Sequence, residues 1–366
     1  MKRYLAIFIS TLIFFLILLN VKLKISDKEF TRPEFYWGVY TNAFVFNQKD
    51  DAFFENRLNK QIPYWNDLSV NIIRFNHENI LEEPQQRVND TMVQKLTENN
   101  IIPYMIIESP FRNFFDEATY QKGFDWGYKI ASRYKGKVKY YQLANEVSGT
   151  VIKKDYPGNN RSDYEIKKYQ ILKNYLLGLS HGIYKADSKA QRVVSAHWLG
   201  TAVIDMLIDD SLEFEIVGWD WYSDMSDQPA IKVLDDGTTL DIPAHFVQKN
   251  KKFWLVEINR HYGDWEDEGG EEQANYIKAV AKQAWFNKNI TGFIIYKLFD
   301  TSSVDDGVKN ADNSFGIIQD TKYFSGEFGP GDLKKAYHEY KKIIEQYKQN
   351  QNIFTKLFRT LADDKL

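Results

Sequence analysis

The chain has 366 residues, of which 43% are hydrophobic, and this is enough apolar material for one large α/β domain. Its formal net charge of −3 is spread over mixed acidic and basic residues without a basic stripe, which argues against a nucleic-acid partner. The chain has no cysteine, so disulfides, thiolate metal sites and a cysteine nucleophile are excluded. Aromatic residues make up 16% of the chain, which suits a ligand with apolar faces that stack on rings, such as carbohydrate.

Residues 1–23 have the features of an export segment. Lys2 and Arg3 precede an apolar run from Tyr4 to Leu19. This run is slightly long for a signal peptide and slightly short for a spanning helix, and no small-residue cleavage site follows it. We predict an uncleaved signal anchor in preference to a cleaved signal peptide. Either alternative places the rest of the chain outside the cytoplasm, where it is anchored to the membrane facing the cell exterior or periplasm, or is secreted.

Strand-like and helix-like runs alternate after a polar linker at residues 24–34. The predicted strands, rich in β-branched and aromatic residues, cover residues 35–40, 71–75, 101–107, 139–146, 192–196, 215–220, 252–257 and 292–298. The longer predicted helices cover residues 51–68, 91–99 with Asp90 as N-cap, 117–134, 162–186, 271–287 and 333–347. Eight such strand–helix units predict a single (β/α)₈ TIM barrel, an α/β fold, at residues 35–347.

Two segments extend this plan. Residues 231–240 form an insertion after the sixth strand, where Asp236-Gly237 between alternating residues predicts a β-hairpin on the rim of the barrel. The tail at residues 348–366 carries an apolar stripe that packs either on the barrel or on a partner.

Two of the predicted strands end in a glutamate. Glu146 ends the fourth strand and Glu257 ends the seventh. Parallel strands present their carboxyl ends on one face, and in a closed barrel that face carries the active site. Cleavage of a glycosidic bond needs one carboxylic acid to protonate the departing oxygen and one carboxylate to act at the anomeric carbon. The two glutamates would face each other across the barrel mouth and can fill these roles.

Asn145-Glu146 at the end of strand four and Glu257 at the end of strand seven resemble the clan A glycoside hydrolases, which are retaining barrel enzymes. Later stretches around Tyr296 and residues 314–318 resemble family 39, and the barrel as a whole is similar to families 39 and 5. The resemblance implies that Glu146 is the general acid and later the base, Glu257 the nucleophile, and Asn145 the partner of the sugar 2-hydroxyl. Retention implies carboxyl groups about 5 to 5.5 Å apart, against roughly 6.5 to 9.5 Å for inversion.

The resemblance also assigns supporting residues. The clan places an arginine at the end of strand two and a tyrosine at the end of strand six, and both contact the nucleophile; Arg74 and Tyr222 occupy these positions, with Asp220 close by as a further candidate. A cation and a hydroxyl donor favour the ionised form of a carboxylate, whereas an acid without them keeps its proton. Many members place a tryptophan on strand eight as the floor of the −1 sugar site, and here Tyr296 or a neighbour would serve.

Other candidates for sugar contact lie at predicted strand ends. His197 and Trp198 follow strand five and His261 follows strand seven, and they either contact sugar or are held by loop backbone. The candidate stacking platforms are Trp37, Trp198, Trp219, Trp221 and Trp265.

We expect no cofactor and no metal. The chain has no dinucleotide fingerprint, P-loop or H-E-x-x-H motif, and the acidic loop at residues 264–272 lacks the residue order of a calcium loop. The expected partners are a carbohydrate substrate and, through an uncleaved N-terminal segment, the membrane, and the protein is expected to be a monomer.

The sequence therefore predicts a retaining glycoside hydrolase that cleaves β-linked bonds of a poly- or oligosaccharide by double displacement. Aromatic residues at several strand ends favour an endo-acting cleft over an exo-acting pocket. The alternative is a non-catalytic glycan-binding barrel, accessory to cell-envelope polysaccharide assembly, which predicts the same groove but a broken acid and nucleophile pair.

Overall fold

A computed structural model of the chain describes residues 34–41, 51–77, 83–111, 113–198, 200–234, 237–267, 269–301, 311–320 and 329–348. The chain divides into two compact units, of which Phe35–Glu345 is one and Met1–Glu34 with Gln346–Leu366 is the other. The predicted anchor at residues 1–23 and the stripe of the C-terminal tail lie outside the described residues. No helix within the described ranges is long and apolar enough to cross a membrane.

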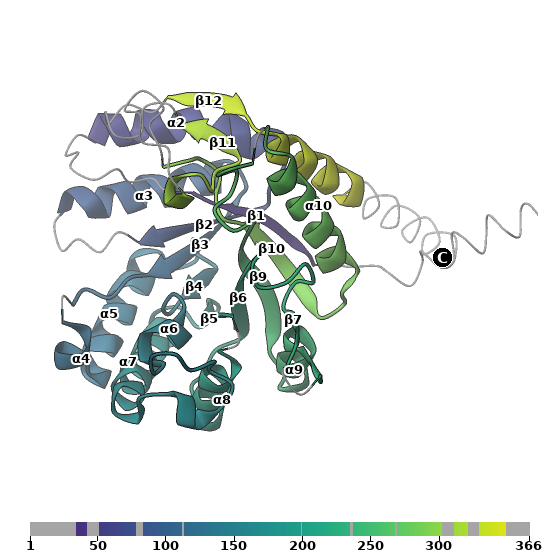
Figure 1. Ribbon diagram of the computed structural model, residues 1–366. Helices are drawn as coiled ribbons and strands as arrows, with labels where there is room; N and C mark the ends of the chain where they lie inside the picture. Colours follow the sequence, from purple (N-terminus) through teal and green to yellow (C-terminus); the bar gives the residue numbers. More distant parts are fainter. Residues whose placement is uncertain are drawn as a thin grey trace, which may run out of the picture. The chain divides into compact units, whose positions relative to one another are not determined.

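The unit Phe35–Glu345 contains a closed barrel of parallel strands, as predicted (Figure 1). The order around the barrel is β1-β10-β9-β6-β5-β4-β3-β2. The strands are β1 (Tyr36–Tyr40), β2 (Ile72–His77), β3 (Ile102–Ile107), β4 (Tyr140–Gln142), β5 (Gln191–His197), β6 (Ile216–Tyr222), β9 (Lys252–Asn259) and β10 (Ile290–Ile295).

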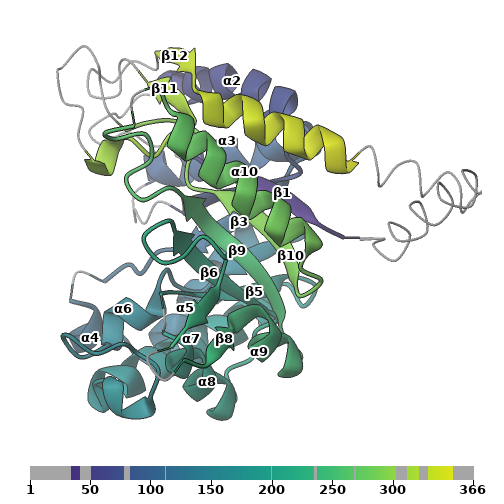
Figure 2. The same cartoon turned by 45° about the vertical axis from the view of Figure 1, so that its right-hand side comes forward.

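Helices surround the barrel on its outer side (Figures 1 and 2). One main helix follows each barrel strand, and the last begins at residue 335 and is described as far as residue 348. The other seven are α2 (Asp51–Leu68), α3 (Glu83–Glu98), α5 (Tyr120–Arg133), α7 (Ile166–Ala186), α8 (Thr201–Asp209), α9 (Ile242–Gln248) and α10 (Glu271–Phe286). The fold is therefore the predicted (β/α)₈ TIM barrel.

Large aromatic side chains fill the lower part of the barrel. The Trp254 ring lies at the centre, 4.9 Å from the ring of Tyr36, 4.7 Å from that of Tyr140 and 5.8 Å from that of Tyr104. A Cβ at Gly292 would lie 2.7 Å from the Trp254 ring, so the neighbouring strand needs a glycine at this point. This packed floor closes the barrel and leaves only its upper end open for chemistry.

Several shorter elements lie in the connections. The predicted hairpin is present as β7 (Ile231–Val233) and β8 (Thr239–Asp241), which pair antiparallel. The remaining short elements are α4 (Phe114–Glu117), α6 (Val147–Val151), the 3₁₀ turns η2 (Arg161–Asp163) and η3 (Ala311–Asn313), and the antiparallel pair β11 (Ile318–Asp320) and β12 (Pro330–Leu333).

Several predicted boundaries are wrong. Strand β4 ends at Gln142 rather than at Glu146, and α7 begins at Ile166 rather than at residue 162. Helix α3 begins at Glu83 rather than after Asp90, so Asp90 lies within the helix, and its carboxylate accepts a hydrogen bond of 2.7 Å from Arg133 instead of capping. The predicted helix at residues 117–134 is divided into α4 and α5, because Thr119 adopts an extended conformation and caps α5 through its hydroxyl.

Candidate active site

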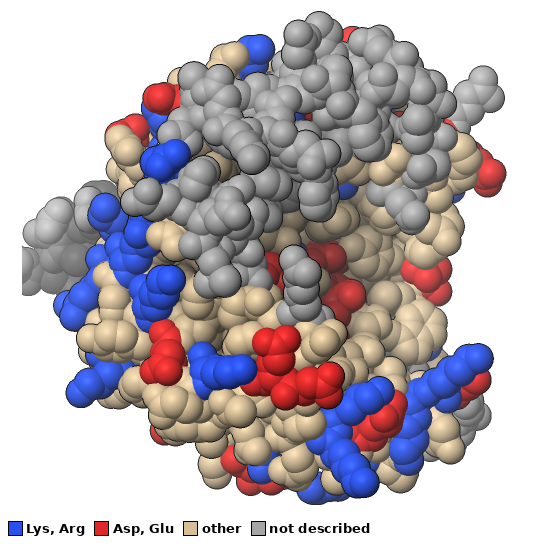
Figure 3. All heavy atoms as spheres, turned by 90° about the vertical axis from the view of Figure 1, so that its left-hand side faces the viewer, with Lys and Arg blue, Asp and Glu red and all other residues tan. Residues whose placement is uncertain are grey.

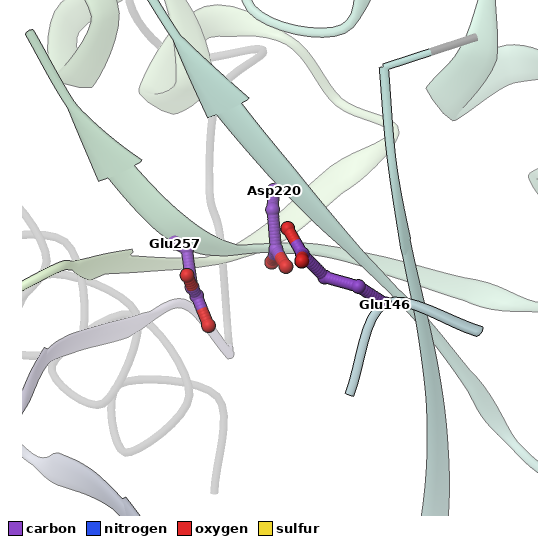
Figure 4. Close-up of side chains that lie close together, drawn as sticks. All are labelled: Glu146, Asp220 and Glu257. Carbon is purple, nitrogen blue, oxygen red and sulfur yellow. The ribbon is translucent and has the colours of Figure 1, made fainter. Parts of the chain in front are cut away.

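Three carboxyl groups converge at the carboxyl ends of the barrel strands (Figure 4). Glu146 follows β4, Asp220 lies near the end of β6, and Glu257 lies near the end of β9. One oxygen of each lies within 4.8 Å of the others. Figure 3 views the side toward which β2 and β3 point in Figure 1, and acidic side chains lie in a hollow of that surface.

A β-bulge turns Glu257 into the barrel. On β9, Trp254 and Val256 both fill the barrel interior, so strict alternation would point Glu257 outward to the helices. Opposite β6, however, the register passes from Trp219–Leu255 to Asp220–Glu257, which leaves Val256 as an extra residue. The bulge re-aims the next side chain, and Glu257 is brought beside Asp220 at the barrel mouth.

Both oxygens of Glu257 accept a hydrogen bond. Arg74 donates from Nη1 to Oε1 at 2.6 Å, and the Tyr222 hydroxyl donates to Oε2 at 3.0 Å. Arg74 is fully buried. Burial opposes its charge, but the nearby Glu257, Tyr104 and Asp220 raise the pKa of Arg74, so it remains a cation. The structure thus brings Arg74, Tyr222 and Glu257 together with the contacts that the resemblance implies.

Gln142 organises the polar residues beneath the mouth. Its Oε1 accepts from Arg74 Nε at 3.1 Å and from the Tyr104 hydroxyl at 2.5 Å. Its Nε2 donates to Asn145 Oδ1 at 2.8 Å and to Ser195 Oγ at 2.9 Å. Arg74 also donates from Nη2 to Asn145 Oδ1 at 2.6 Å, which fixes the Asn145 side chain from two sides.

Sequence reasoning did not identify Tyr104, Gln142 and Ser195 as site residues. Each is a fully buried residue with a polar group on a barrel strand. Gln142 and Tyr140 are two residues apart and therefore share the inward face of β4. The sequence signal that could have identified these residues is a polar side chain at an inward position near the carboxyl end of a buried strand.

The backbone of Glu146 adopts a left-handed conformation, with φ of 44° and ψ of 52°. For a residue other than glycine this conformation costs about 1–3 kcal/mol and persists only where the surroundings enforce it. Here Glu146 N donates to Ser195 Oγ at 3.0 Å, and Gly149 N donates to the Glu146 carbonyl at 3.0 Å. These contacts anchor the strained residue between β4 and α6 and carry its side chain over the mouth.

The Glu146 side chain is 39% exposed, and His197 Nδ1 lies 3.7 Å from its Oε1. The His197 ring also contacts Ser148 Oγ at 3.1 Å. Burial raises the pKa of Glu146, and the negative charge of Glu257 acts in the same direction, while His197 opposes them. A carboxyl group in this environment is suited to holding a proton and releasing it.

Asp220 is the third carboxyl of the cluster and is fully buried. Apart from the neighbouring Glu146 carboxyl, neither of its oxygens has a hydrogen-bond partner among the residues that the structure describes. Burial raises the pKa of Asp220 well above its ordinary value, and the nearby Glu257 and Glu146 carboxylates raise it further. This environment favours the protonated form of Asp220.

The structure does not bring Trp37 to the barrel mouth. Its ring is fully buried on the outer side of β1, 5.9 Å from the ring of Trp285 and 6.1 Å from that of Tyr340. Trp219 and Trp221 on β6 are also fully buried and alternate with the inward-facing residues. The assignment of Trp37 to sugar contact is corrected accordingly, because strand parity makes it a packing residue between sheet and helices.

The other predicted contact residues lie around the mouth. The Trp198 ring is partly buried, and Lys232 Nζ from the hairpin lies 4.2 Å from its centroid. His261 Nδ1 lies 3.4 Å from an oxygen of Asp224. Tyr296 directly follows β10, where the clan has tryptophan, and its ring lies 5.0 Å from the Tyr40 ring. Their contact with a ligand stays a prediction.

The three carboxyls fit a metal ion poorly. They form a group whose oxygens are close enough to coordinate one cation. Both oxygens of Glu257 are already bonded to Arg74 and Tyr222, however, and a guanidinium cation beside the site would repel a divalent ion. The arrangement suits protons and an electrophilic carbon better than a metal.

The acidic loop at residues 264–272 has structural partners. Asp267 accepts hydrogen bonds from the backbone N–H groups of Glu272 and Gln273 at the start of α10. Asp264 pairs with Lys334 at 2.8 Å. These two carboxylates therefore have structural roles, one at a helix start and one beside a buried lysine.

No protein-family model matches the sequence, and no curated protein matches it. Solved structures do share the fold. A family 1 β-glucosidase from Thermotoga maritima has a TM-score of 0.58 at 14% identity, over 86% of this chain and 98% of that chain. The β-glucosidase of that organism in complex with glucoimidazole gives the same values, and its complex with cyclophellitol gives 0.56 at 13%, with the same coverage. This likeness establishes the barrel fold, and the similarity to families 39 and 5 stays a prediction.

Proposed function

We propose that the protein is a retaining glycoside hydrolase that cleaves β-linked glycosidic bonds. The observation that carries the proposal is the approach of Glu146 and Glu257, whose nearest oxygens lie within 4.8 Å across the barrel mouth. This spacing supports retention, for which the carboxyl groups are about 5 to 5.5 Å apart, because inversion needs roughly 6.5 to 9.5 Å to admit a water molecule.

In this mechanism Glu257 attacks the anomeric carbon while Glu146 protonates the departing glycosidic oxygen. Arg74 and Tyr222 hold the nucleophile in place through its two oxygens. Water then enters, Glu146 removes its proton, and the covalent glycosyl ester on Glu257 is hydrolysed. Asn145, which Arg74 and Gln142 hold in position, would be the partner of the sugar 2-hydroxyl, as the resemblance implies.

The substrate class that we propose is a β-linked poly- or oligosaccharide. The structural neighbours are β-glucosidases, so aryl β-glucosides are the first small substrates to test. The test uses the chain from residue 24 onward, assayed on aryl β-glucosides and on a panel of β-linked polysaccharides. We expect release of sugar, and proton NMR should show the β-anomer as the first product.

Two variants and one control complete this test. Glu146→Gln should lower kcat by roughly 10² to 10⁴-fold on substrates with poor leaving groups, and Glu257→Gln should abolish turnover. Glu165→Gln removes a partly exposed glutamate that pairs with Lys168 outside the site and should leave activity unchanged. Glycan binding without sugar release from any substrate would instead favour the accessory barrel, and an α-anomer as first product would exclude retention.

We also propose that the barrel lies outside the cytoplasm, because residues 1–23 have the charge and apolar pattern of an export segment. A fusion of the full chain to a reporter that is active only after export should show activity, and deletion of residues 1–23 should remove it. Retention of the full-length protein in the membrane fraction would support the anchor, whereas a shorter, freely released product would support cleavage.

A further inference from the structure

Asp220 is a carboxyl group that the two-carboxylate mechanism leaves without a role. It lies inside the cluster, with oxygens close to those of Glu146 and Glu257 (Figure 4). It is fully buried, and apart from the Glu146 carboxyl no group among the described residues reaches either oxygen with a hydrogen bond. An ionised carboxylate in such a place would cost several kcal/mol, because it would have lost water and gained no hydrogen bond.

Arg74 does not satisfy Asp220, although it lies in the same site. Its three nitrogens donate to Gln142, Glu257 and Asn145. The titratable and charged groups that face Asp220 from the surrounding elements are Arg74 of β2, Tyr104 of β3, Glu146 after β4, His197 of β5, Tyr222 of β6 and Glu257 of β9.

Within this set, Glu146 is the suitable partner for a proton held by Asp220. Both oxygens of Glu257 are occupied by Arg74 and Tyr222, and the Tyr104 hydroxyl is bonded to Gln142. The Glu146 carboxyl faces Asp220, and a hydrogen bond between them needs one proton, which either group can carry. Two carboxyls in this relation titrate as a pair and lose their protons in two separate steps.

We propose that Asp220 and Glu146 form a carboxyl pair that shares one proton, in which Asp220 is a positioning residue that holds the proton against Glu146, and Glu146 transfers it to the substrate. This proposal rests on the function proposed above and adds a source for the catalytic proton.

The pair balances charge through both steps of the reaction. Before the first step the pair holds one proton and one negative charge, and Glu257 carries another. When Glu146 gives the proton to the departing oxygen, the pair becomes doubly negative, while Glu257 becomes a neutral ester. In the second step the attacking water gives a proton to the pair. The ester bond breaks, and Glu257 is again a carboxylate. The three carboxyls therefore carry two negative charges in the free enzyme and also in the glycosyl-enzyme. The single positive charge of Arg74 beside them does not change.

The first test needs no substrate. Infrared titration of the wild-type chain should show a protonated carboxyl band at neutral pH that is absent from Asp220→Asn. In Glu146→Gln the band should disappear at lower pH than in the wild type, because the amide donates to Asp220 and stabilises its ionised form. If Asp220→Asn does not fold, the titration of Glu146→Gln still tests the pair. Identical carboxyl bands in the wild type and a folded Asp220→Asn, or an unchanged titration in Glu146→Gln, would overturn the pair.

The second test compares leaving groups. For phenyl β-glucoside, whose departing oxygen needs a proton, the alkaline limb of kcat/KM should move to lower pH by about one unit or more in Asp220→Asn. For a dinitrophenyl β-glucoside, which needs no proton, kcat/KM should stay within about threefold of the wild type.

The control is Asp224→Asn, which removes a negative charge from the rim, where Asp224 is 46% exposed and lies beside His261. Its alkaline limb should match that of the wild type. The pair would be contradicted if the alkaline limb of kcat/KM in Asp220→Asn were unshifted. It would also be contradicted if kcat/KM fell equally on both substrates. A chain that shows the infrared band but hydrolyses nothing would retain the pair and refute the hydrolase, which separates the two proposals.

Discussion

Arg74 connects the groups of the candidate site at the scale of single residues. Its guanidinium reaches Glu257, Asn145 and Gln142 with three different nitrogens, and its side chain is fully buried. A planar fork of donors can hold a carboxylate, an amide and a second amide at fixed angles, whereas a lysine ammonium is a compact charge without that geometry. The shape of Arg74, as well as its charge, therefore positions the nucleophile.

Arg74→Lys should keep a positive charge and lose this geometry. We expect kcat/KM on an aryl β-glucoside to fall by about 100-fold or more. Tyr222→Phe removes one hydrogen bond to Glu257 and retains the ring, so its loss should be roughly 10-fold to 100-fold. The control is Arg133→Lys at the end of α5, where an exposed arginine pairs with Asp90 of α3, and it should leave kcat/KM unchanged. Equal activity of Arg74→Lys and the wild type would show that charge alone is sufficient.

Helices α5 and α7 show how glycine brings two elements together. Gly123 and Gly127 of α5 face Gly178 and Gly182 of α7, and a Cβ at any of the four would collide with a backbone carbonyl oxygen of the other helix. Backbone approaches this close are possible only where the contact residues are small. The two helices follow β3 and β4, so their packing supports the strand that leads to Glu146.

Gly127→Ala should therefore destabilise the fold even though alanine is the better helix former. The added methyl group meets the Leu179 carbonyl, and overpacking of this kind costs about 1–3 kcal/mol. Urea unfolding followed by circular dichroism measures the change. Ser132→Ala, at an exposed position of the same helix, should alter the free energy of unfolding by less than about 0.5 kcal/mol. An unchanged free energy of unfolding in Gly127→Ala would mean that the two helices can move apart without loss of stability.

A buried ion cluster joins distant parts of the whole barrel unit. Lys334 Nζ lies 2.8 Å from an oxygen of Asp264, after β9, and 2.8 Å from an oxygen of Asp300, after β10. Lys334 directly precedes the helix that begins at residue 335. Burial raises the pKa of Asp300 to about 6, and Lys334 opposes this effect. One lysine thus pairs with two carboxylates at the point where the last helix packs onto the barrel.

Lys334→Met should cost about 3–5 kcal/mol at neutral pH, because it leaves two buried carboxylates without their cation. Lys335→Met, which removes the neighbouring exposed partner of Glu271, should cost less than about 1 kcal/mol. The difference between the two variants should shrink on acidification through about pH 6, because protonation relieves the buried charge at Asp300. Urea unfolding at a series of pH values measures both effects, and a difference that does not change with pH would rule out uncompensated charge as the cause.

The order of the barrel elements was already determined by local sequence. The eight strands and most helices follow from apolar runs separated by amphipathic stretches, because the periods of 2 and 3.6 residues are properties of neighbouring side chains. The same reading placed Glu146 and Glu257 at the ends of strands four and seven. Arg74 and Tyr222 followed from the resemblance to a known clan, and the structure brings both to Glu257.

Only the tertiary structure decided where these side chains point. The bulge at Val256 turns Glu257 inward and depends on the register between β9 and β6. Strand alternation turned Trp37 outward, and barrel closure brought Asp220 beside Glu146 from strands far apart in sequence. Side-chain direction and distance across a barrel are set by long-range pairing, which local periodicity does not encode. The sequence by itself therefore determined the elements and the two glutamates, and tertiary packing made them a cluster of three carboxyls.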